Sequence, residues 1–234
     1  AGVSSWDQRQ LERQVRKQNK KKKNEQVLTV GTQNFNGIMG EHQLEEAYLT
    51  MKLRGIGILC GQEGRRPKHS VTRWDTEELM VAFEGDNVGG NTSMKKDGNF
   101  FIMTAKWKAA FLKGGKQMKR FCPRLVTIRV PLGNGKDLYL INVHWPDDSR
   151  PRAVREAFQQ RLEDAISEET PTDILVLGGD WNACTGTSDN LSDGVCGPWG
   201  HPYLNRAGRV LRTLAAYHQL ADLVTFEQQK MEST

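Results

Sequence analysis

The chain is divided into short apolar runs, rich in β-branched residues, that are separated by Gly, Asn, Pro and Lys. Runs of this kind with these boundaries are typical of β-strands. A sheet built from them must bury its apolar faces against a second layer, which restricts the chain to a few layered architectures. We predict strands at 27–35, 55–63, 79–85, 99–107, 124–132, 137–145 and 174–180.

Three other segments have apolar residues at helical spacing. The first lies between two strands and therefore predicts a βαβ unit, whereas the runs from 79 to 145 predict consecutive antiparallel strands. The fold class is α/β, with two mixed sheets face to face and helices outside. The predicted helices and apolar faces are 41–54 (Leu44, Ala47, Tyr48, Met51), 150–169 (Val154, Ala157, Phe158, Leu162, Ala165) and 205–220 (Val210, Leu211, Leu214, Ala215).

The positive charge of the chain is concentrated in two places. Its 234 residues, 37% of them hydrophobic, are enough for one domain with a buried core, and the net charge is +5. The stretch from Arg9 to Lys23 contains a single acid, Glu12, and is typical of a solvated basic segment. We predict a basic flexible arm at 1–26 and a single domain at 27–234.

The second basic stretch, Lys106 to Arg124, has seven cations and no acid, with aromatic residues between them. Such a composition suits a polyanion, because cations bind phosphates and aromatic rings stack on bases. A solvated hairpin with ordinary core aromatics fits the composition equally well. The residues expected to contact nucleic acid are Lys106, Trp107, Lys108, Lys119, Arg120 and Arg124.

The four cysteines form no CxxC pair and have no metal-ligand spacing, so we expect reduced thiols. No apolar run approaches the roughly 20 residues of a membrane helix, and the N-terminal stretch is too polar for a secretory signal. We therefore expect no membrane contact and an intracellular location, in the nucleus or in an organelle that contains nucleoprotein.

Polar residues follow successive predicted strands at the point where each strand ends. They are Asn34, Glu63, His144, Asp180 and Asn182. Each alone has an ordinary explanation, since Asn forms turns, Glu is solvated and His can lie in a core. Strand ends gather at one rim of a sheet, however, and ligands bind at such rims. The set as a whole favours a shared site.

Phosphodiester hydrolysis needs this set of side chains. Mg²⁺ requires only one or two carboxylates, and Glu63 is the best candidate to hold it. Asn34 and Asn182 can donate to phosphate oxygens without adding negative charge. Asp180 can accept a proton from an attacking water, and His144 can stabilise the pentacovalent phosphorus as a cation.

With these residues in view, the chain resembles the endonuclease/exonuclease/phosphatase superfamily, which includes DNase I and apurinic endonucleases. The matching segments occur in the order of that family: TQNFNG, CGQEGR, INVHWP and GGDWNA. The segment at 205–226 resembles the one that follows the GD-N motif in non-LTR retrotransposon endonucleases and the related craniofacial-development-protein-like sequences.

The resemblance implies a DNase I-like, four-layer α/β sandwich of two mixed, mainly antiparallel sheets with outer helices. It also implies that Glu63 holds a divalent metal, Mg²⁺ or else Mn²⁺, with Asn34 and Asn36 beside it. His144 would lie near the scissile phosphate, and Arg124 would hold a flanking phosphate. Asp180 and Asn182 would position the water and the phosphate.

Family members continue beyond the equivalent of Thr234 with an Asp-bearing strand and a Ser-Asp-His segment whose His is essential. The chain ends at Thr234, so we expect the second sheet to lack its last strands and to have an open apolar edge. Three explanations are open: the sequence is a fragment, another protein chain covers the edge, or the protein is no longer a nuclease.

Three functions follow from this. The first is a Mg²⁺-dependent DNA endonuclease of retrotransposon type, with DNA preferred to RNA as the partner. The second is an inactive relative that serves as a nucleic-acid-binding or structural subunit of a nucleoprotein complex. The third is a phosphatase or deadenylase that acts on a smaller phosphoester, against which the cationic stretch from Lys106 to Arg124 argues.

Overall fold

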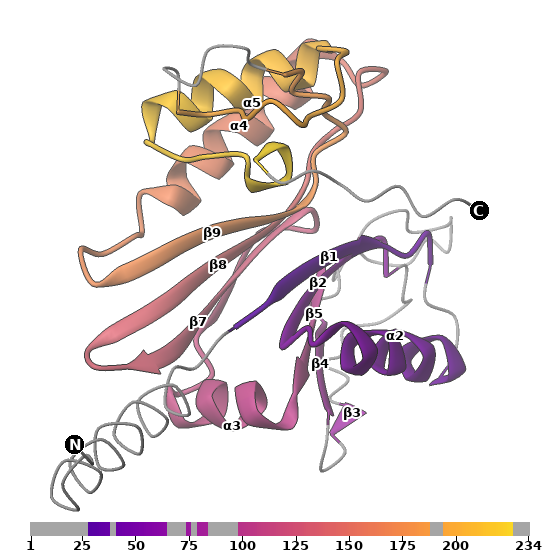
Figure 1. The fold of residues 1–234 in the computed structure, drawn as a ribbon, viewed down its shortest axis with the longest axis vertical. Helices are drawn as coiled ribbons and strands as arrows, with labels where there is room; N and C mark the ends of the chain where they lie inside the picture. The colour runs from indigo at the N-terminus through magenta and orange to yellow at the C-terminus, as the bar shows by residue number, and fades with distance from the viewer. Residues whose placement is uncertain are drawn as a thin grey trace, which may run out of the picture.

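The computed structural model describes residues 28–37, 41–64, 74–75, 79–83, 98–187 and 194–226 (Figure 1). The basic arm predicted at 1–26 lies outside these residues. None of the helices in the described ranges is long and apolar enough to cross a bilayer.

Two sheets form the centre of the molecule. The first has the strand order β1-β2-β5-β4-β3 and the second the order β6-β7-β8-β9. The strands are β1 (Val30–Asn34), β2 (Ile58–Gln62), β3 (Trp74–Asp75), β4 (Leu79–Phe83), β5 (Phe100–Thr104), β6 (Met118–Cys122), β7 (Leu125–Gly133), β8 (Lys136–His144) and β9 (Asp173–Asp180). The helices are α2 (Glu41–Arg54), α3 (Ala105–Lys113), α4 (Arg152–Ile166), α5 (Arg206–Tyr217) and the 3-10 helix η2 (Leu223–Thr225).

Each sheet contains one parallel pair of strands joined through a helix. In the first sheet β1 pairs parallel with β2 across α2, and in the second β8 pairs parallel with β9 across α4. The remaining pairs are antiparallel. The predicted βαβ unit and the two mixed, mainly antiparallel sheets are therefore confirmed.

Alternation of side chains along the strands gives each sheet an inner and an outer face. In β2, Ile58 packs in the core between the sheets, whereas its neighbour Leu59 packs with α2. In β8, Leu140 packs in that same core, whereas Ile141 packs with α4 and α5. Figure 1 shows α2 outside the first sheet and α4 with α5 outside the second. The order of layers is helix, sheet, sheet, helix, as the sequence resemblance implies.

The helix α3 corrects two sequence predictions. The predicted strand at 99–107 ends at Thr104, and the chain then turns into a helix whose Trp107 and Phe111 fill the core between the sheets. The segment after α3 forms β6, so β5 and β7 lie in different sheets. The runs from 79 to 145 are therefore not one antiparallel series.

The other helices follow their predicted bounds closely. The helix at 41–54 is α2 as predicted, and α4 is shorter than its predicted range by a few residues at each end. On α4, Phe158, Leu162 and Ala165 are buried as expected, but Val154 is 48% exposed and Ala157 is exposed, so the buried face of the helix is narrower than predicted.

The strands β8 and β9 approach each other closely beside Asp180. A Cβ added at Gly179 would lie 1.9 Å from the carbonyl oxygen of Val143, and Gly179 has a φ of 151°. Only glycine fits a contact this close to the backbone of the neighbouring strand.

We predict that Gly179→Ala lowers the free energy of unfolding by about 3 kcal/mol, since backbone atoms must move to admit the methyl group. Urea unfolding measures the loss. Gly115→Ala is the matched control, because Gly115 also has a positive φ of 83° but nothing lies within 4 Å of the added Cβ. It should cost about 1 kcal/mol, the price of the backbone conformation alone. Equal losses in the two variants would contradict the prediction.

A buried carboxylate ties the start of β9 to β7. Arg129 Nη2 donates to Asp173 Oδ2 at 2.9 Å, and the Asp173 side chain is 1% exposed. The backbone N–H of Thr170 donates to the same oxygen at 2.8 Å. Burial acts to raise the pKa of Asp173, but the bonds from Arg129 and Thr170 outweigh it, so the pKa is lowered.

We predict that Asp173→Asn costs about 2 kcal/mol of stability at neutral pH, because charged hydrogen bonds are lost. The carboxyl pKa is lower in the folded chain than in the unfolded chain, so its contribution is present above the unfolded pKa of about 4 and is lost as pH falls below it. Urea unfolding of both proteins at pH 7 and pH 3 measures the difference. A difference that stays constant or grows in acid would contradict the prediction.

Candidate functional site

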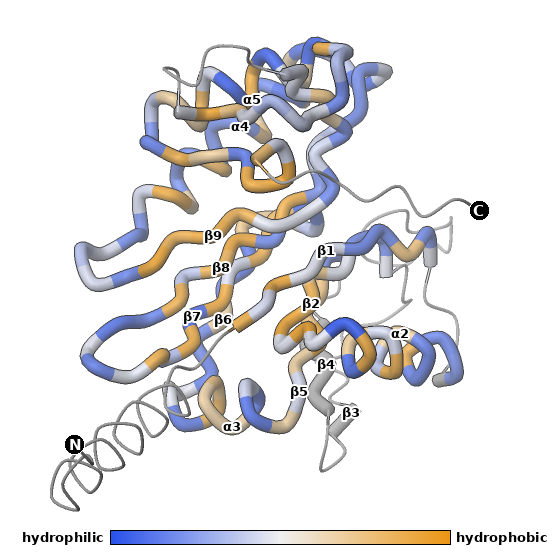
Figure 2. The backbone as a smooth tube through the Cα atoms, in the orientation of Figure 1, coloured by the Kyte–Doolittle hydropathy of each residue, from blue (hydrophilic) through white to orange (hydrophobic). Residues whose placement is uncertain are grey.

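The inner faces of the two sheets change from apolar to polar toward one end of the sandwich. Along β1, Val30 packs against the core, whereas Asn34 at the end of the strand is exposed. Along β9, Val176 packs against the same core, and Asp180 ends the strand. Figure 2 shows β1 changing from hydrophobic near its start to hydrophilic at its end. The polar strand ends therefore meet at one rim, as predicted.

The amide of Asn34 joins two carboxylates that come from different sheets. Its Nδ2 donates to Glu63 Oε1 at 3.0 Å and to Asp180 Oδ2 at 2.9 Å. The backbone N–H of Asn36 donates to Asn34 Oδ1 at 2.9 Å, which fixes the amide with its nitrogen toward the acids. Asn34 and Asp180, which are 146 positions apart in the sequence, are thus bonded directly to each other.

Glu63 reaches this rim because its backbone breaks the alternation of β2. Gln62 faces the inner core, so an extended Glu63 would point to the outer face. Glu63 instead has a φ of 55°, a left-handed conformation that is unfavourable for a residue with a side chain. This conformation brings its carboxylate to Asn34 and His144.

His144 lies at the end of β8, directly opposite Asp180 in the parallel pairing of β8 with β9. Its Nε2 is 3.7 Å from Glu63 Oε1, and its side chain is 4% exposed. The backbone N–H of His144 donates to the carbonyl oxygen of Arg124 at 2.9 Å. A protonated imidazole in this position would form an ion pair with Glu63.

Asn182 is held beside Asp180 by the backbone around it. Its N–H donates to Asp180 Oδ1 at 2.9 Å, and its Nδ2 donates to the carbonyl oxygen of Trp145 at 2.8 Å. The residue has a φ of 47°, which Asn tolerates better than most residues. The structure therefore brings Asn34, Glu63, His144, Asp180 and Asn182 together in one site.

The residues predicted to contact nucleic acid do not form one surface. Arg124 lies next to the site, because its carbonyl oxygen accepts the N–H of His144. Lys106 and Lys108 lie on α3 at the other end of the sandwich, since β5 runs antiparallel to β2. Trp107 is 3% exposed and packs in the core, which corrects its assignment as a stacking residue.

The predicted basic contacts on β6 lie between these two ends. Lys119 forms an ion pair with Glu168, and its ammonium lies over the ring of Phe121. Arg120 pairs with Val126 of the neighbouring strand. Both residues lie on the edge strand of the second sheet, and Val126 is two residues along the chain from Arg124.

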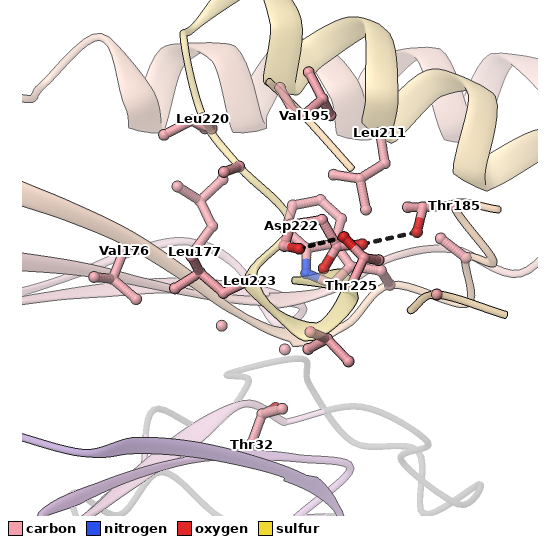
Figure 3. Close-up of a pocket in the computed structure, with 18 of the residues that line it drawn as sticks. Thr32, Val176, Leu177, Thr185, Val195, Leu211, Leu220, Asp222, Leu223 and Thr225 are labelled. Carbon is pink, nitrogen blue, oxygen red and sulfur yellow. Dashed lines mark hydrogen bonds between the residues drawn. The ribbon is translucent and has the colours of Figure 1, made fainter. Parts of the chain in front are cut away.

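A large hollow opens beside the site between β1 and β9. It has a volume of about 1220 Å³, and Thr32, Asp180, Asn182 and Asp222 contribute to its lining. Figure 3 shows apolar side chains of β9, α5 and η2 around Asp222, whose Oδ2 accepts from Thr185 Oγ1 at 2.7 Å. Within the described residues β1 and β9 each pair with one strand only, so the hollow runs along two strand edges.

The donor set of the site suits a hard divalent cation. Its oxygen ligands are the carboxylates of Glu63 and Asp180, and the Asn34 amide turns its nitrogen toward both of them. No cluster of three or more His, Cys, Asp or Glu side chains with metal-binding geometry occurs in the parts of the chain that the structure describes. Mg²⁺ fits such a site, because it keeps several waters and needs only one or two protein carboxylates.

Comparisons with known proteins identify the fold. The 3' phosphatase NExo from Neisseria, bound to a product DNA hairpin, is 15% identical with a TM-score of 0.51, over 81% of this chain and 71% of that one. An AP endonuclease from Archaeoglobus fulgidus is 16% identical with a TM-score of 0.50, over 82% and 71%. The AP endonuclease LMAP from Leishmania major is 15% identical with a TM-score of 0.48, over 66% of this chain and 55% of that one.

The chain therefore spans little more than half the length of the Leishmania enzyme. No protein-family model and no curated protein sequence matches the present chain. Its two mixed sheets with outer helices form the DNase I-like fold, which is the fold of the endonuclease/exonuclease/phosphatase superfamily.

The sequence analysis did not identify Asn205, whose side chain holds the backbone of Asn182. Its Nδ2 donates to the carbonyl oxygen of Asn182 at 2.9 Å. Its Oδ1 accepts from Cys184 N at 3.1 Å and from Gly208 N at 2.7 Å, so it is also the N-cap of α5. An Asn directly before a helical apolar pattern is a capping signal, which identifies the cap but not its link to the site.

We predict that Asn205→Ala lowers the free energy of unfolding by about 1–2 kcal/mol, because the first turn of α5 loses its cap. Asn205→Asp keeps an acceptor for Gly208 and Cys184 and should lose less than half as much. Urea unfolding compares the two variants. A larger loss for Asn205→Asp would mean that the donor to Asn182, rather than the cap, dominates the stability of this corner.

Proposed function

We propose that the chain is a Mg²⁺-dependent phosphodiesterase that cuts nucleic acid. The observation that carries the proposal is the Asn34 amide, which lies within 3.0 Å of both the Glu63 and the Asp180 carboxylates. Two acids held this close by a neutral donor, with His144 beside them, supply a general base, a carboxylate for a cation and an imidazole in one place.

Each side chain has a defined part in the reaction. Asp180 accepts the proton of the attacking water, and Asn182 fixes the orientation of that carboxylate through its backbone N–H. His144 as imidazolium balances the charge that develops on the phosphorus oxygens. Arg124, whose carbonyl oxygen accepts the N–H of His144, would bind an adjacent phosphate.

Glu63 would hold the divalent cation through its carboxylate, with Asn34 and Asn36 beside it. When bound there, Mg²⁺ would supply Lewis-acid polarisation of a phosphoryl oxygen and positive charge for the transition state. The separation of Glu63 from Asp180 by the Asn34 amide leaves one carboxylate for the cation and the other for the proton.

We further propose that the substrate is DNA and that the enzyme is an endonuclease of retrotransposon type. The segment that resembles retrotransposon endonucleases forms α5 and η2, which line the hollow beside Asp180. The net charge of +5 suits a polyanion. The similar Neisseria structure holds a DNA hairpin, which favours DNA over RNA.

The test is the nicking of supercoiled plasmid DNA by the full chain with Mg²⁺. We predict that Glu63→Gln and Asp180→Asn each reduce kcat by about 10²-fold or more, because cation binding or proton transfer is lost. Glu156→Gln is the control: it removes an exposed carboxylate on α4 that pairs with Arg152, and it should retain full activity.

Inactivity of the native chain, or equal activity in Glu63→Gln, would contradict the proposal. Salt-sensitive DNA or RNA binding without cleavage would instead identify the chain as a non-catalytic nucleic-acid-binding subunit. Cleavage of small phosphoesters but not of DNA would identify a phosphatase.

A further inference from the structure

Three fully buried amide side chains lie directly below the site. Gln62, Asn99 and Asn142 each have 0% exposure. They continue the inner faces of the strands, since Gln62 follows Cys60 in alternation, Asn142 follows Leu140, and Asn99 precedes Phe101. The core between the sheets therefore becomes polar one layer before the surface.

Asn142 connects β8 to two neighbouring strands of the other sheet, β2 and β5. Its Nδ2 donates to the carbonyl oxygens of Gly61 at 3.0 Å and Phe100 at 2.9 Å. Its Oδ1 accepts from Gln62 Nε2 at 2.8 Å and from Asn99 Nδ2 at 3.3 Å. Every polar atom of this side chain is thus used in bonds from one sheet to the other.

Asn99 makes the reverse connection from the first sheet to the second. Its Nδ2 donates to the carbonyl oxygens of Arg124 and Asn142, each at 2.9 Å. The Arg124 oxygen also accepts the backbone N–H of His144. Asn99 therefore bonds to the carbonyl oxygen that accepts from His144 and to the carbonyl oxygen of Asn142, two residues before His144.

Each amide is next to a site residue in the chain or bonded to its backbone. Gln62 directly precedes Glu63, and its carbonyl oxygen accepts from Phe35 N at 3.1 Å, beside Asn34. Asn142 is two residues before His144 on the same face of β8. Glu63 and His144 belong to different sheets, so their 3.7 Å contact depends on how the sheets are placed relative to each other.

An apolar core would hold the sheets together without these groups. Replacing a buried hydrogen-bonded pair by apolar groups of the same shape is often neutral for stability, so stability alone does not call for them. Hydrogen bonds differ from apolar contacts in fixing direction and register. Reacting groups need such fixing, because a misplacement of about 1 Å can cost about 10² in rate.

We propose that Gln62, Asn99 and Asn142 are positioning residues that lock the two sheets in the register at which Glu63 and His144 meet. The catalytic part of this inference rests on the proposed function. The amides touch no substrate. They act through the backbone of Glu63, Arg124 and His144.

The test compares Asn142→Ala with Val130→Ala. The Val130 side chain is fully buried in the same core between the sheets, and its replacement removes methyl groups but no hydrogen bonds. Both variants should lose stability by about 1–3 kcal/mol. In the folded state Asn142→Ala should reduce kcat for DNA cleavage by about 10²-fold with little change in KM, whereas Val130→Ala should keep the native kcat.

NMR provides a readout that does not depend on activity. The ring resonances of His144 at fixed pH should shift in Asn142→Ala and remain native in Val130→Ala. If the native chain cleaves no nucleic acid, the proposed function fails while the NMR comparison still decides the positioning role.

Native kcat and native His144 resonances in folded Asn142→Ala would overturn the proposal, as would an equal loss of kcat in Val130→Ala. If Asn142→Ala does not fold, Asn99→Ala replaces it, because that variant keeps the bonds from Asn142 to Gly61 and Phe100.

Discussion

The structure depends on the contact between the inner faces of two sheets. Each parallel pair, β1 with β2 and β8 with β9, carries its strand ends to the same rim only while the sheets stay face to face. The apolar part of the core, around Phe101 and Leu140, supplies the cohesion, and the buried amides above it supply the direction. Between the sheets, the side chains thus change from apolar, to buried polar, to the polar residues of the site at the rim.

Much of the fold could be predicted from the sequence because local signals agreed with tertiary structure. The helix at 41–54 has the predicted bounds, and the seven apolar runs all contain strands. Polar residues at strand ends were sufficient to suggest a shared rim, since strand direction restricts where such ends lie. That Asn34 would bond to both Glu63 and Asp180 is a property of the packed sheets.

The failures have identifiable physical reasons. Trp107 and Phe111 are spaced for a helix, but an apolar run continuing from β5 hid the change of period at Thr104. β6 is an edge strand whose cations give it little apolar signal. The bonds of Asn142 could not be predicted, because its four partners come from strands separated by tens of residues.

The left-handed backbone of Glu63 has a consequence for how such a chain can change. A glycine there would relax the conformation, at a gain of about 1 kcal/mol, and would at the same time delete the carboxylate. The stability of the fold therefore favours glycine at this position, whereas the site requires a carboxylate there. The chain has an acid at a position where glycine would avoid the backbone strain.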